Sequence, residues 1–213
     1  MRAIVFANGI LSHPVMLRAG DVVIAADGGA RHCLKLGITP QVVIGDFDSL
    51  TEDELASLES AGAQVIRHPA RKDFTDLELA LQHAGSCGVE EILVYAALGD
   101  RWDQTVANLL LPAAPGLEGV HIRIVDGPQE ISLLRPGPPC EICGQMGDTV
   151  SLIPLRGDIT GVVTTGLEYP LKGETLYFGA TRGISNILLG DLAAVQFAAG
   201  LLLCIVIHSI QDR

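Results

Sequence analysis

The chain has 213 residues, of which 48% are apolar and 18% charged, and its formal net charge is −11. This composition is typical of a globular protein and excludes a disordered chain. The negative charge argues against nucleic acid or an anionic membrane as a partner, because both reward clustered Lys and Arg. An acidic protein can still bind phosphates through a metal ion.

The first 126 residues predict an α/β domain. Six short β-branched runs, each followed by a turn and usually by a helical pattern, indicate βαβ units with a parallel, Rossmann-like sheet. In chain order these runs are AIVFAN, DVVIAAD, QVVIGD, AQVIRH, EILVYAAL and HIRIVD. The first begins the chain without the apolar core and cleavage site of a signal peptide, so we interpret it as a strand.

Two helices in this half carry the spacing of a capping box. Thr51 stands three residues before Glu54, and Thr75 stands three residues before Glu78. In this motif each partner satisfies a backbone N–H of the other at the start of a helix. An apolar stripe on the second helix, formed by Leu77, Leu81 and Ala84, predicts the face that it buries.

After residue 126 the pattern changes to short strands without helices. Gly and Pro separate the runs EISLLR, DTVSLIPL, ITGVVTT, ETLYFG and AAVQFAAGLLLCIVIH, which is typical of a small all-β sandwich or barrel. We place the boundary near Gly127 and Pro128, giving domains of residues 1–126 and 127–213. The apolar segment FAAGLLLCIVIHSI is too short to span a bilayer and predicts a buried strand.

The chain has five scattered cysteines, an odd number that favours a reducing, cytoplasmic environment. Two of them form the segment CEIC at Cys140–Cys143. A structural zinc site needs four ligands, and the sequence has no second pair. We expect this segment to be a plain loop.

Acidic residues follow the strands of the first half. The run VVIGDFDSL ends in Asp46 and Asp48, and side chains at i and i+2 of an extended segment point the same way. The loops after parallel strands meet at one edge of the sheet, which is expected to gather Asn8, Gly9, Asp27, Gly28, Gly29, Asp46, Asp48, Asp73, Asp76, Asp100 and Asp103. Any single aspartate here could be a helix cap. Together they imply Mg²⁺ or a cationic substrate, and a nucleotide triphosphate is the natural partner of Mg²⁺.

Six motifs, in order along both halves, resemble the thiamine pyrophosphokinase family. They are ADGGA (26–30), GDFDS (45–49), KDFTD (72–76), LGDRWDQ (98–104), GLEYPL (166–171) and GISN (183–186). Members of that family transfer diphosphate from ATP to the hydroxyethyl group of thiamine and release AMP. The resemblance implies an α/β catalytic domain followed by a β-sandwich, with Mg²⁺ as the cofactor. It also implies a homodimer whose sites are shared between subunits.

The resemblance further implies a role for each matching residue. Mg²⁺ would be held by Asp46, Asp48 and one or both of Asp73 and Asp76, and Asp103 would complete the catalytic set near the thiamine hydroxyl. The residues expected to bind ATP are Asn8, Gly9, Asp27, Gly28, Gly29, Ser49, Thr75 and Arg101, with Arg71 and Lys72 as further candidates to balance phosphate charge. The residues expected to bind thiamine are Tyr169, Ser185, Asn186, Asp103 and Gln104.

One position departs from the family pattern. Asp100 stands where the family usually has Gly, and a side chain there would be strained if the backbone needs a positive φ.

Two alternative functions stay open. A haloacid-dehalogenase-type phosphatase also uses a strand-ending D-x-D, although usually near its N-terminus. A catalytically silent sensor of thiamine or nucleotide is the other, and Asp100 is its support.

Overall fold

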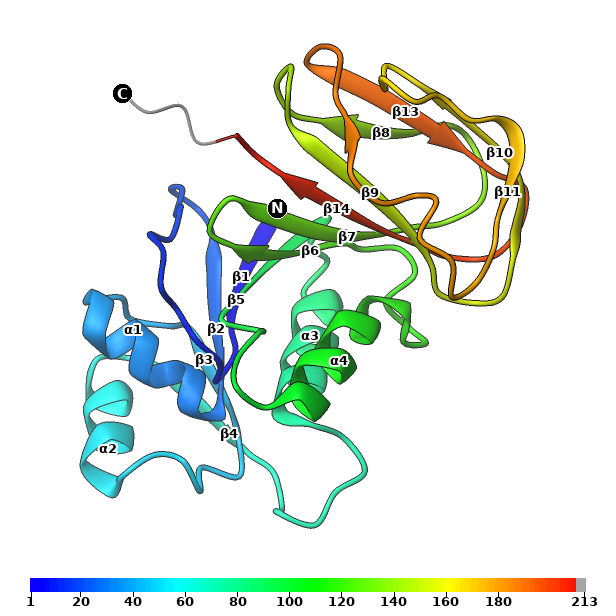
Figure 1. Ribbon diagram of the computed structural model, residues 1–213. Helices are drawn as coiled ribbons and strands as arrows, with labels where there is room; N and C mark the ends of the chain where they lie inside the picture. The colour runs from blue at the N-terminus through cyan, green and yellow to red at the C-terminus, as the bar shows by residue number, and fades with distance from the viewer. Residues whose placement is uncertain (210–213) are drawn as a thin grey trace. The chain divides into compact units, whose positions relative to one another are not determined.

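A computed structural model describes residues 1–209, and the chain divides into two compact units, Met1–Gly127 and a second unit that begins at Pro128 (Figure 1). The first unit is an α/β domain with a parallel sheet, and the second is built from antiparallel strands alone. The fold class predicted from the sequence is therefore confirmed. Within the described residues no helix combines the length and apolarity that crossing a membrane requires.

The sheet of the first unit has six parallel strands, one for each of the predicted runs. They are β1 (Arg2–Phe6), β2 (Val22–Ala26), β3 (Val42–Gly45), β4 (Gln64–Arg67), β5 (Glu91–Tyr95) and β6 (His121–Asp126). Their spatial order is β6–β5–β1–β2–β3–β4. The chain runs outward from β1 to β4 and then returns to β5, on the other side of β1. In open sheets, ligands bind beyond the carboxyl ends of the strands at such a switch point.

Helices cover both faces of this sheet. The helices α1 (Ala30–Leu36) and α2 (Glu52–Ser60) lie on one face, and α3 (Asp76–Ser86) and α4 (Trp102–Leu110) lie on the other (Figure 1). The 3₁₀ turn η1 (Asp27–Gly29) precedes α1, and the 3₁₀ turn η2 (Leu111–Ala113) follows α4. This division follows from right-handed crossovers, because the return from β4 to β5 reverses the direction of travel across the sheet. The predicted stripe on α3 is buried, with Leu81 and Ala84 exposed by 1% or less.

The two predicted capping boxes have different outcomes. At α2, Thr51 and Glu54 form the complete reciprocal pair. At α3, Thr75 accepts a hydrogen bond from the Glu78 N–H, but no bond returns to the backbone of Thr75. The Glu78 carboxylate instead accepts from Gln82 Nε2, one turn along the helix. The prediction of a second capping box was therefore wrong for the bond between the Glu78 side chain and the Thr75 backbone N–H.

The second unit is a sandwich of two antiparallel sheets. Its strands are β7 (Gln129–Leu134), β8 (Cys140–Cys143), β9 (Thr149–Pro154), β10 (Ile159–Thr165), β11 (Lys172–Leu176), β12 (Asn186–Ile187), β13 (Leu192–Gln196) and β14 (Leu202–Ile207). One sheet has the order β12–β9–β14–β7, and the other has the order β11–β10–β13–β8. Side chains from both sheets, including Val150, Ile159, Val195 and Leu202, are fully buried in one shared core.

Three expectations for this unit were wrong. CEIC is the strand β8 rather than a loop, because it pairs with β13 and buries Ile142. The run AAVQFAAGLLLCIVIH is divided into β13 and β14, which lie in different sheets, since a turn containing Gly200 at φ 95° reverses the chain. In ETLYFG the strand ends at Leu176, and the following Tyr and Phe are exposed. Of FAAGLLLCIVIHSI, the final Ile210 lies outside the described residues.

One buried carboxylate ties the end of β14 to the β8–β9 loop. Asp148 is 1% exposed and accepts hydrogen bonds from the Gln145 N–H, the Ser209 N–H and His208 Nδ1. Burial alone would raise the pKa of Asp148, but these bonds outweigh it and hold the pKa below its ordinary value. The ionised carboxylate therefore stabilises this corner of the fold.

Candidate active site

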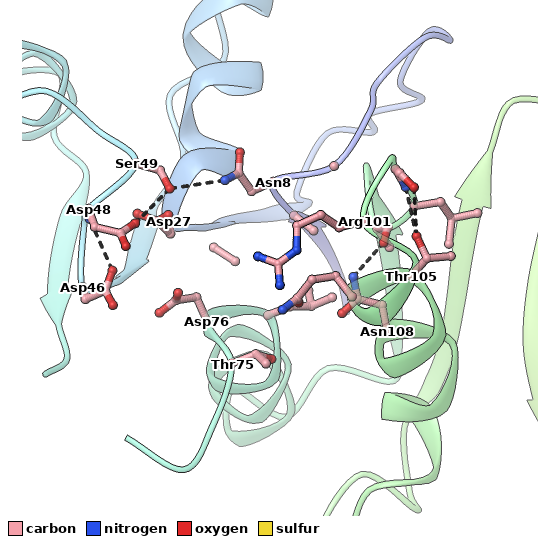
Figure 2. A pocket seen from close by; sticks show the side chains of 18 of the residues that line it. Asn8, Asp27, Asp46, Asp48, Ser49, Thr75, Asp76, Arg101, Thr105 and Asn108 are labelled. Atoms are coloured by element: carbon pink, nitrogen blue, oxygen red, sulfur yellow. Dashed lines mark hydrogen bonds between the residues drawn. The ribbon is translucent and has the colours of Figure 1, made fainter. Parts of the chain in front are cut away.

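A pocket of about 600 Å³ opens at the carboxyl ends of β1, β2, β3 and β5 (Figure 2). Its walls come from the loops after these four strands, the segment that leads into α3, and the first two turns of α4. Asp46, Asp48 and Asp76 lie on one side of the pocket, and Arg101, Thr105 and Asn108 lie on the other (Figure 2). The pocket therefore stands at the β1–β5 switch point, where this fold class binds ligands.

Three carboxylates converge within this pocket. One ligand atom from each of Asp27, Asp46 and Asp76 lies within 4.8 Å of the other two. Asp27 is 6% exposed, and its Oδ1 is buried with no hydrogen-bond partner. A buried acceptor is costly when it has no partner, so this oxygen is free for a cation. Carboxylate oxygens are the ligands that Mg²⁺ prefers, which means that the residues present fit this ion.

Lys72 lies beside two of these carboxylates. Its Nζ is 2.8 Å from Asp76 Oδ1 and 3.5 Å from Asp46 Oδ2. Burial alone would lower the pKa of Lys72, but the ion pairs outweigh it and raise the pKa above its ordinary value. Burial raises the pKa of Asp76, Lys72 opposes that shift, and the negative charges of Asp46 and Asp27 add to it. The cluster thus holds more negative charge than its single ammonium neutralises.

Strained backbone marks the rim of the pocket. Three non-glycine residues with positive φ stand one or two residues after β2, β3 and β5: Asp27 (43°), Phe47 (64°) and Ala96 (56°). Each such residue costs about 1–3 kcal/mol, and strain of this kind gathers at functional sites. The expectation of an extended segment through Asp46 and Asp48 was wrong, because β3 ends at Gly45 and the chain turns at Phe47. Both carboxylates nevertheless line the pocket.

Asp48 links a hydrogen-bonded chain to one of the three converging carboxylates, because the Asp48 N–H donates to Asp46 Oδ1 at 3.3 Å (Figure 2). The Asp48 Oδ1 accepts from Ser49 Oγ at 3.0 Å, and Ser49 Oγ accepts from Asn8 Nδ2 at 3.3 Å. Asn8 packs in turn against Gly28, where a Cβ atom would lie 2.3 Å from Asn8 Oδ1. The glycines of the DGG segment therefore allow loops to pack closely, and neither Gly28 nor Gly29 lines the pocket.

The start of α4 places a charged pair at the edge of the pocket. Arg101 donates two hydrogen bonds to the Asp103 carboxylate, at 2.6 and 3.2 Å, and both side chains are largely exposed. Arg101 and Gln104 line the pocket, but Asp103 does not. The bond from Arg101 holds the pKa of Asp103 below its ordinary value. Asp100 also lines the pocket and has a negative φ, so the strain considered for this position is absent.

Two further polar residues of α4 were missed by the sequence interpretation. Thr105 Oγ1 bonds both the N–H and the C=O of Gly99, and Asn108 Nδ2 donates to Ala97 O at 2.7 Å. Both side chains are buried, whereas Trp102 and Val106 on the same helix are exposed. This inverted pattern of polar and apolar residues is the signal that could have identified them. Together they fix the loop after β5 against the pocket.

The second unit has a smaller pocket, of about 330 Å³. Tyr169, a residue that is 63% exposed, lines it together with Arg182 and Asn186. The Asn186 side chain accepts from the Tyr169 N–H at 3.0 Å and donates to Tyr169 O at 2.8 Å. Asn186 thus holds the backbone that carries the aromatic ring. Ser185 is exposed at φ 59° and is not among the lining residues.

The structure brings most of the sequence-predicted residues together, in two groups. In the first pocket these are Asn8, Gly9, Asp27, Asp46, Asp48, Ser49, Thr75, Asp76, Arg101 and Gln104, and in the second they are Tyr169 and Asn186. Gly28, Gly29, Asp73, Asp103 and Ser185 lie outside the pocket walls. Asp73 precedes α3 on an exposed segment, so of the two aspartates in KDFTD it is Asp76 that joins the converging carboxylates.

Comparison with known proteins assigns both halves of the chain. The sequence profile described as "Thiamin pyrophosphokinase, catalytic domain" matches residues 14–123, and "Thiamin pyrophosphokinase, vitamin B1 binding domain" matches residues 139–202. A curated thiamine pyrophosphokinase from Bacillus subtilis is 33% identical over 182 residues, which is 85% of each chain. The chain belongs to the thiamin pyrophosphokinase family. This membership confirms the family and the enzyme class that the six motifs predicted.

Solved structures of the thiamin pyrophosphokinase family agree with the fold. The crystal structure of the Bacillus subtilis enzyme has a TM-score of 0.87 and 29% identity, covering 99% of this chain and 100% of that one. A thiamin pyrophosphokinase family protein from Enterococcus faecalis has a TM-score of 0.88 and 28% identity, with both chains covered completely. The phosphatase alternative has no support in these matches.

Proposed function

We propose that this enzyme transfers diphosphate from ATP to the hydroxyl group of thiamine, forming thiamine diphosphate and AMP, with Mg²⁺ as cofactor. The observation that carries this proposal is the convergence of Asp27, Asp46 and Asp76 around an unpartnered buried oxygen, in the pocket at the switch point. Diphosphate transfer depends on positioning and charge neutralisation. A carboxylate cluster that holds Mg²⁺ supplies both.

The first pocket supports binding of the nucleotide. Asp27, Asp46 and Asp76 would hold Mg²⁺, which when bound supplies positive charge to the phosphate oxygens. Asp48 and Ser49, fixed by Asn8, line the same wall and can orient water or phosphate oxygens. Arg101 presents an exposed guanidinium from the opposite wall, a group whose fork of donors matches phosphate.

The proton of the thiamine hydroxyl requires an acceptor near the site of transfer. Asp103 suits this role because Arg101 keeps its carboxylate ionised. Gln104 lines the pocket one residue further along α4. Phosphate binding to Arg101 would compete for its bonds to Asp103, which would free the carboxylate when the nucleotide is in place.

The second pocket supports binding of thiamine. Its ligand is a flat cation, and the exposed ring of Tyr169 offers an aromatic face to stack on it. Asn186 holds the ring's backbone and keeps one amide hydrogen available for the aminopyrimidine. Ser185 adds a hydroxyl at the adjacent strained position.

An AMP-release assay with thiamine, ATP and Mg²⁺ tests this function. AMP formed in step with thiamine diphosphate supports the proposal. Release of inorganic phosphate would indicate a phosphatase, and binding of thiamine without turnover would indicate a silent sensor. EDTA should abolish the reaction, and re-addition of Mg²⁺ should restore it.

We further propose that the enzyme is a cytoplasmic homodimer whose sites combine the two kinds of pocket from different subunits. The five free thiols support a reducing location. Mixing Asp46→Ala protein with Asn186→Ala protein tests the shared site, under conditions that allow subunits to exchange. A mixed dimer with shared sites has one intact site, so about a quarter of wild-type activity should return. If each site lies within one chain, no activity returns.

A further inference from the structure

Lys72 occupies the space between carboxylates that would hold the metal. Its Nζ contacts Asp76 Oδ1 at 2.8 Å and Asp46 Oδ2 at 3.5 Å, and its side chain is only 12% exposed. Burial fixes the ammonium among these oxygens rather than in solvent. The same oxygens belong to the three carboxylates that converge around the free Oδ1 of Asp27. Lys72 therefore neutralises part of a cluster that also suits a divalent cation.

The cluster is about the size of a Mg²⁺ site. Mg–O bonds are about 2.1 Å long, so two ligand oxygens on opposite sides of the ion are about 4.2 Å apart. The ligand atoms of Asp27, Asp46 and Asp76 lie within 4.8 Å of one another. A Mg²⁺ ion bound here would therefore use the carboxylates of Asp46 and Asp76 that Lys72 contacts, so the ion and the ammonium compete for them.

Repulsion between Mg²⁺ and the Lys72 ammonium also favours displacement of the ammonium from these carboxylates. An ammonium 2.8 Å from a magnesium ligand would lie within about 5 Å of the ion, since the Mg–O bond adds about 2.1 Å. Two cations at this distance in a partly buried pocket repel each other strongly. Lys72 must then find another anion within reach, and the anion that enters this pocket with Mg²⁺ is the triphosphate.

We propose that Lys72 exchanges partners: its ammonium neutralises Asp46 and Asp76 while Mg²⁺ is absent, and it binds the nucleotide's phosphate oxygens once Mg²⁺ has taken those carboxylates. This inference rests on the proposed use of Mg²⁺ and ATP. It makes Lys72 a residue that disfavours the metal alone and favours the metal together with nucleotide.

The test compares Lys72→Met with wild type and with Lys35→Met. Lys35 is an exposed lysine of the same unit, outside both pockets, so its variant controls for the loss of one positive charge. The first measurement is Mg²⁺ affinity by titration calorimetry without nucleotide. Lys72→Met should bind Mg²⁺ about tenfold more tightly than wild type, within the usual range of coupling between two ligands. Lys35→Met should match wild type.

The second measurement is ATP affinity at saturating Mg²⁺, without thiamine so that no transfer occurs. Lys72→Met should bind ATP about tenfold or more weakly, the loss expected for one charge-assisted hydrogen bond. Unchanged or weaker Mg²⁺ binding by this variant would overturn the proposal. Unchanged ATP binding would overturn it as well, because Lys72 would then remain on the carboxylates.

Whether Lys72→Met folds with and without Mg²⁺ also tests the proposal. A variant that folds only with Mg²⁺ supports the exchange, because the ion then replaces the missing ammonium. A variant that fails to fold even at saturating Mg²⁺ overturns it, since Lys72 would be required whatever the metal. Wild type that binds no Mg²⁺ even with ATP present would instead refute the proposed function, so the two failures are distinguishable.

Discussion

Replacing Asp27 with Asn should make the metal-free protein more stable while it inactivates the enzyme. Asp27 is 6% exposed, and its Oδ1 has no hydrogen-bond partner although Asp46 and Asp76 lie close by. An unsatisfied buried polar group costs about 1–3 kcal/mol, and more when it is charged. The amide keeps the shape of the side chain, tolerates the positive φ of this position, and can donate to a neighbouring carboxylate.

The size of the stabilisation follows from this penalty. We expect the free energy of unfolding in EDTA to rise by about 1–3 kcal/mol, and a chain of this size gains about 2–4 °C in melting temperature for each kcal/mol. Saturating Mg²⁺ should raise the melting temperature of wild type, because it binds the folded state only. It should add little to Asp27→Asn. AMP release should fall about a hundredfold or more, as when one electrostatic stabiliser is lost.

Asp148→Asn provides a matched control. Asp148 is also buried, but three hydrogen bonds satisfy its carboxylate, so the same substitution should lower stability rather than raise it. Melting curves with EDTA and with Mg²⁺ check both variants. A lower melting temperature for Asp27→Asn in EDTA, or a Mg²⁺-induced increase equal to that of wild type, would refute the reasoning.

Three further outcomes are expected. Tyr169→Ala should raise the KM for thiamine by roughly fivefold or more, because about 1 kcal/mol of stacking is lost, and should leave the KM for ATP nearly unchanged. Steady-state kinetics with each substrate varied measures both constants, and a raised KM for ATP with an unchanged KM for thiamine would contradict the prediction. Gly29→Ala should prevent folding of the first unit, because the new Cβ would lie 2.1 Å from Phe6 O, while Gly119→Ala, in open space, should fold normally by circular dichroism. The free energy of unfolding should fall in acid, because folding lowers the pKa of Asp148. The stabilisation from Asp148 is fully present above its pKa in the unfolded chain, about 3.9, and is lost as the pH falls through its lower pKa in the folded protein. Urea unfolding from pH 7 to pH 3 should show this loss in wild type and a smaller one in Asp148→Asn.

Local patterns in the sequence determined the architecture. The β-branched runs identified all six strands of the first sheet, and the Thr51 capping box marked the start of α2. Parallel strands place their carboxyl ends on one edge, so the strand-ending aspartates were expected to meet there. Asp27, Asp46 and Asp76 do meet there. The strands and the capping box are predictable because each depends on residues that are close in the chain, and the shared edge follows from the parallel order of the strands.

The tertiary structure alone decided which side chains converge. Phe47 turns the chain between Asp46 and Asp48, and α3 begins at Asp76 and leaves Asp73 on an exposed segment. CEIC became a strand through pairing with β13, about fifty residues away. Contacts of this range have no periodic signature, because they depend on the register between strands and on the turns that join them. The sequence therefore predicted the edge of the sheet where the aspartates lie. Only the packing of the loops and of α3 brought three of these carboxylates together and placed Lys72 against two of them.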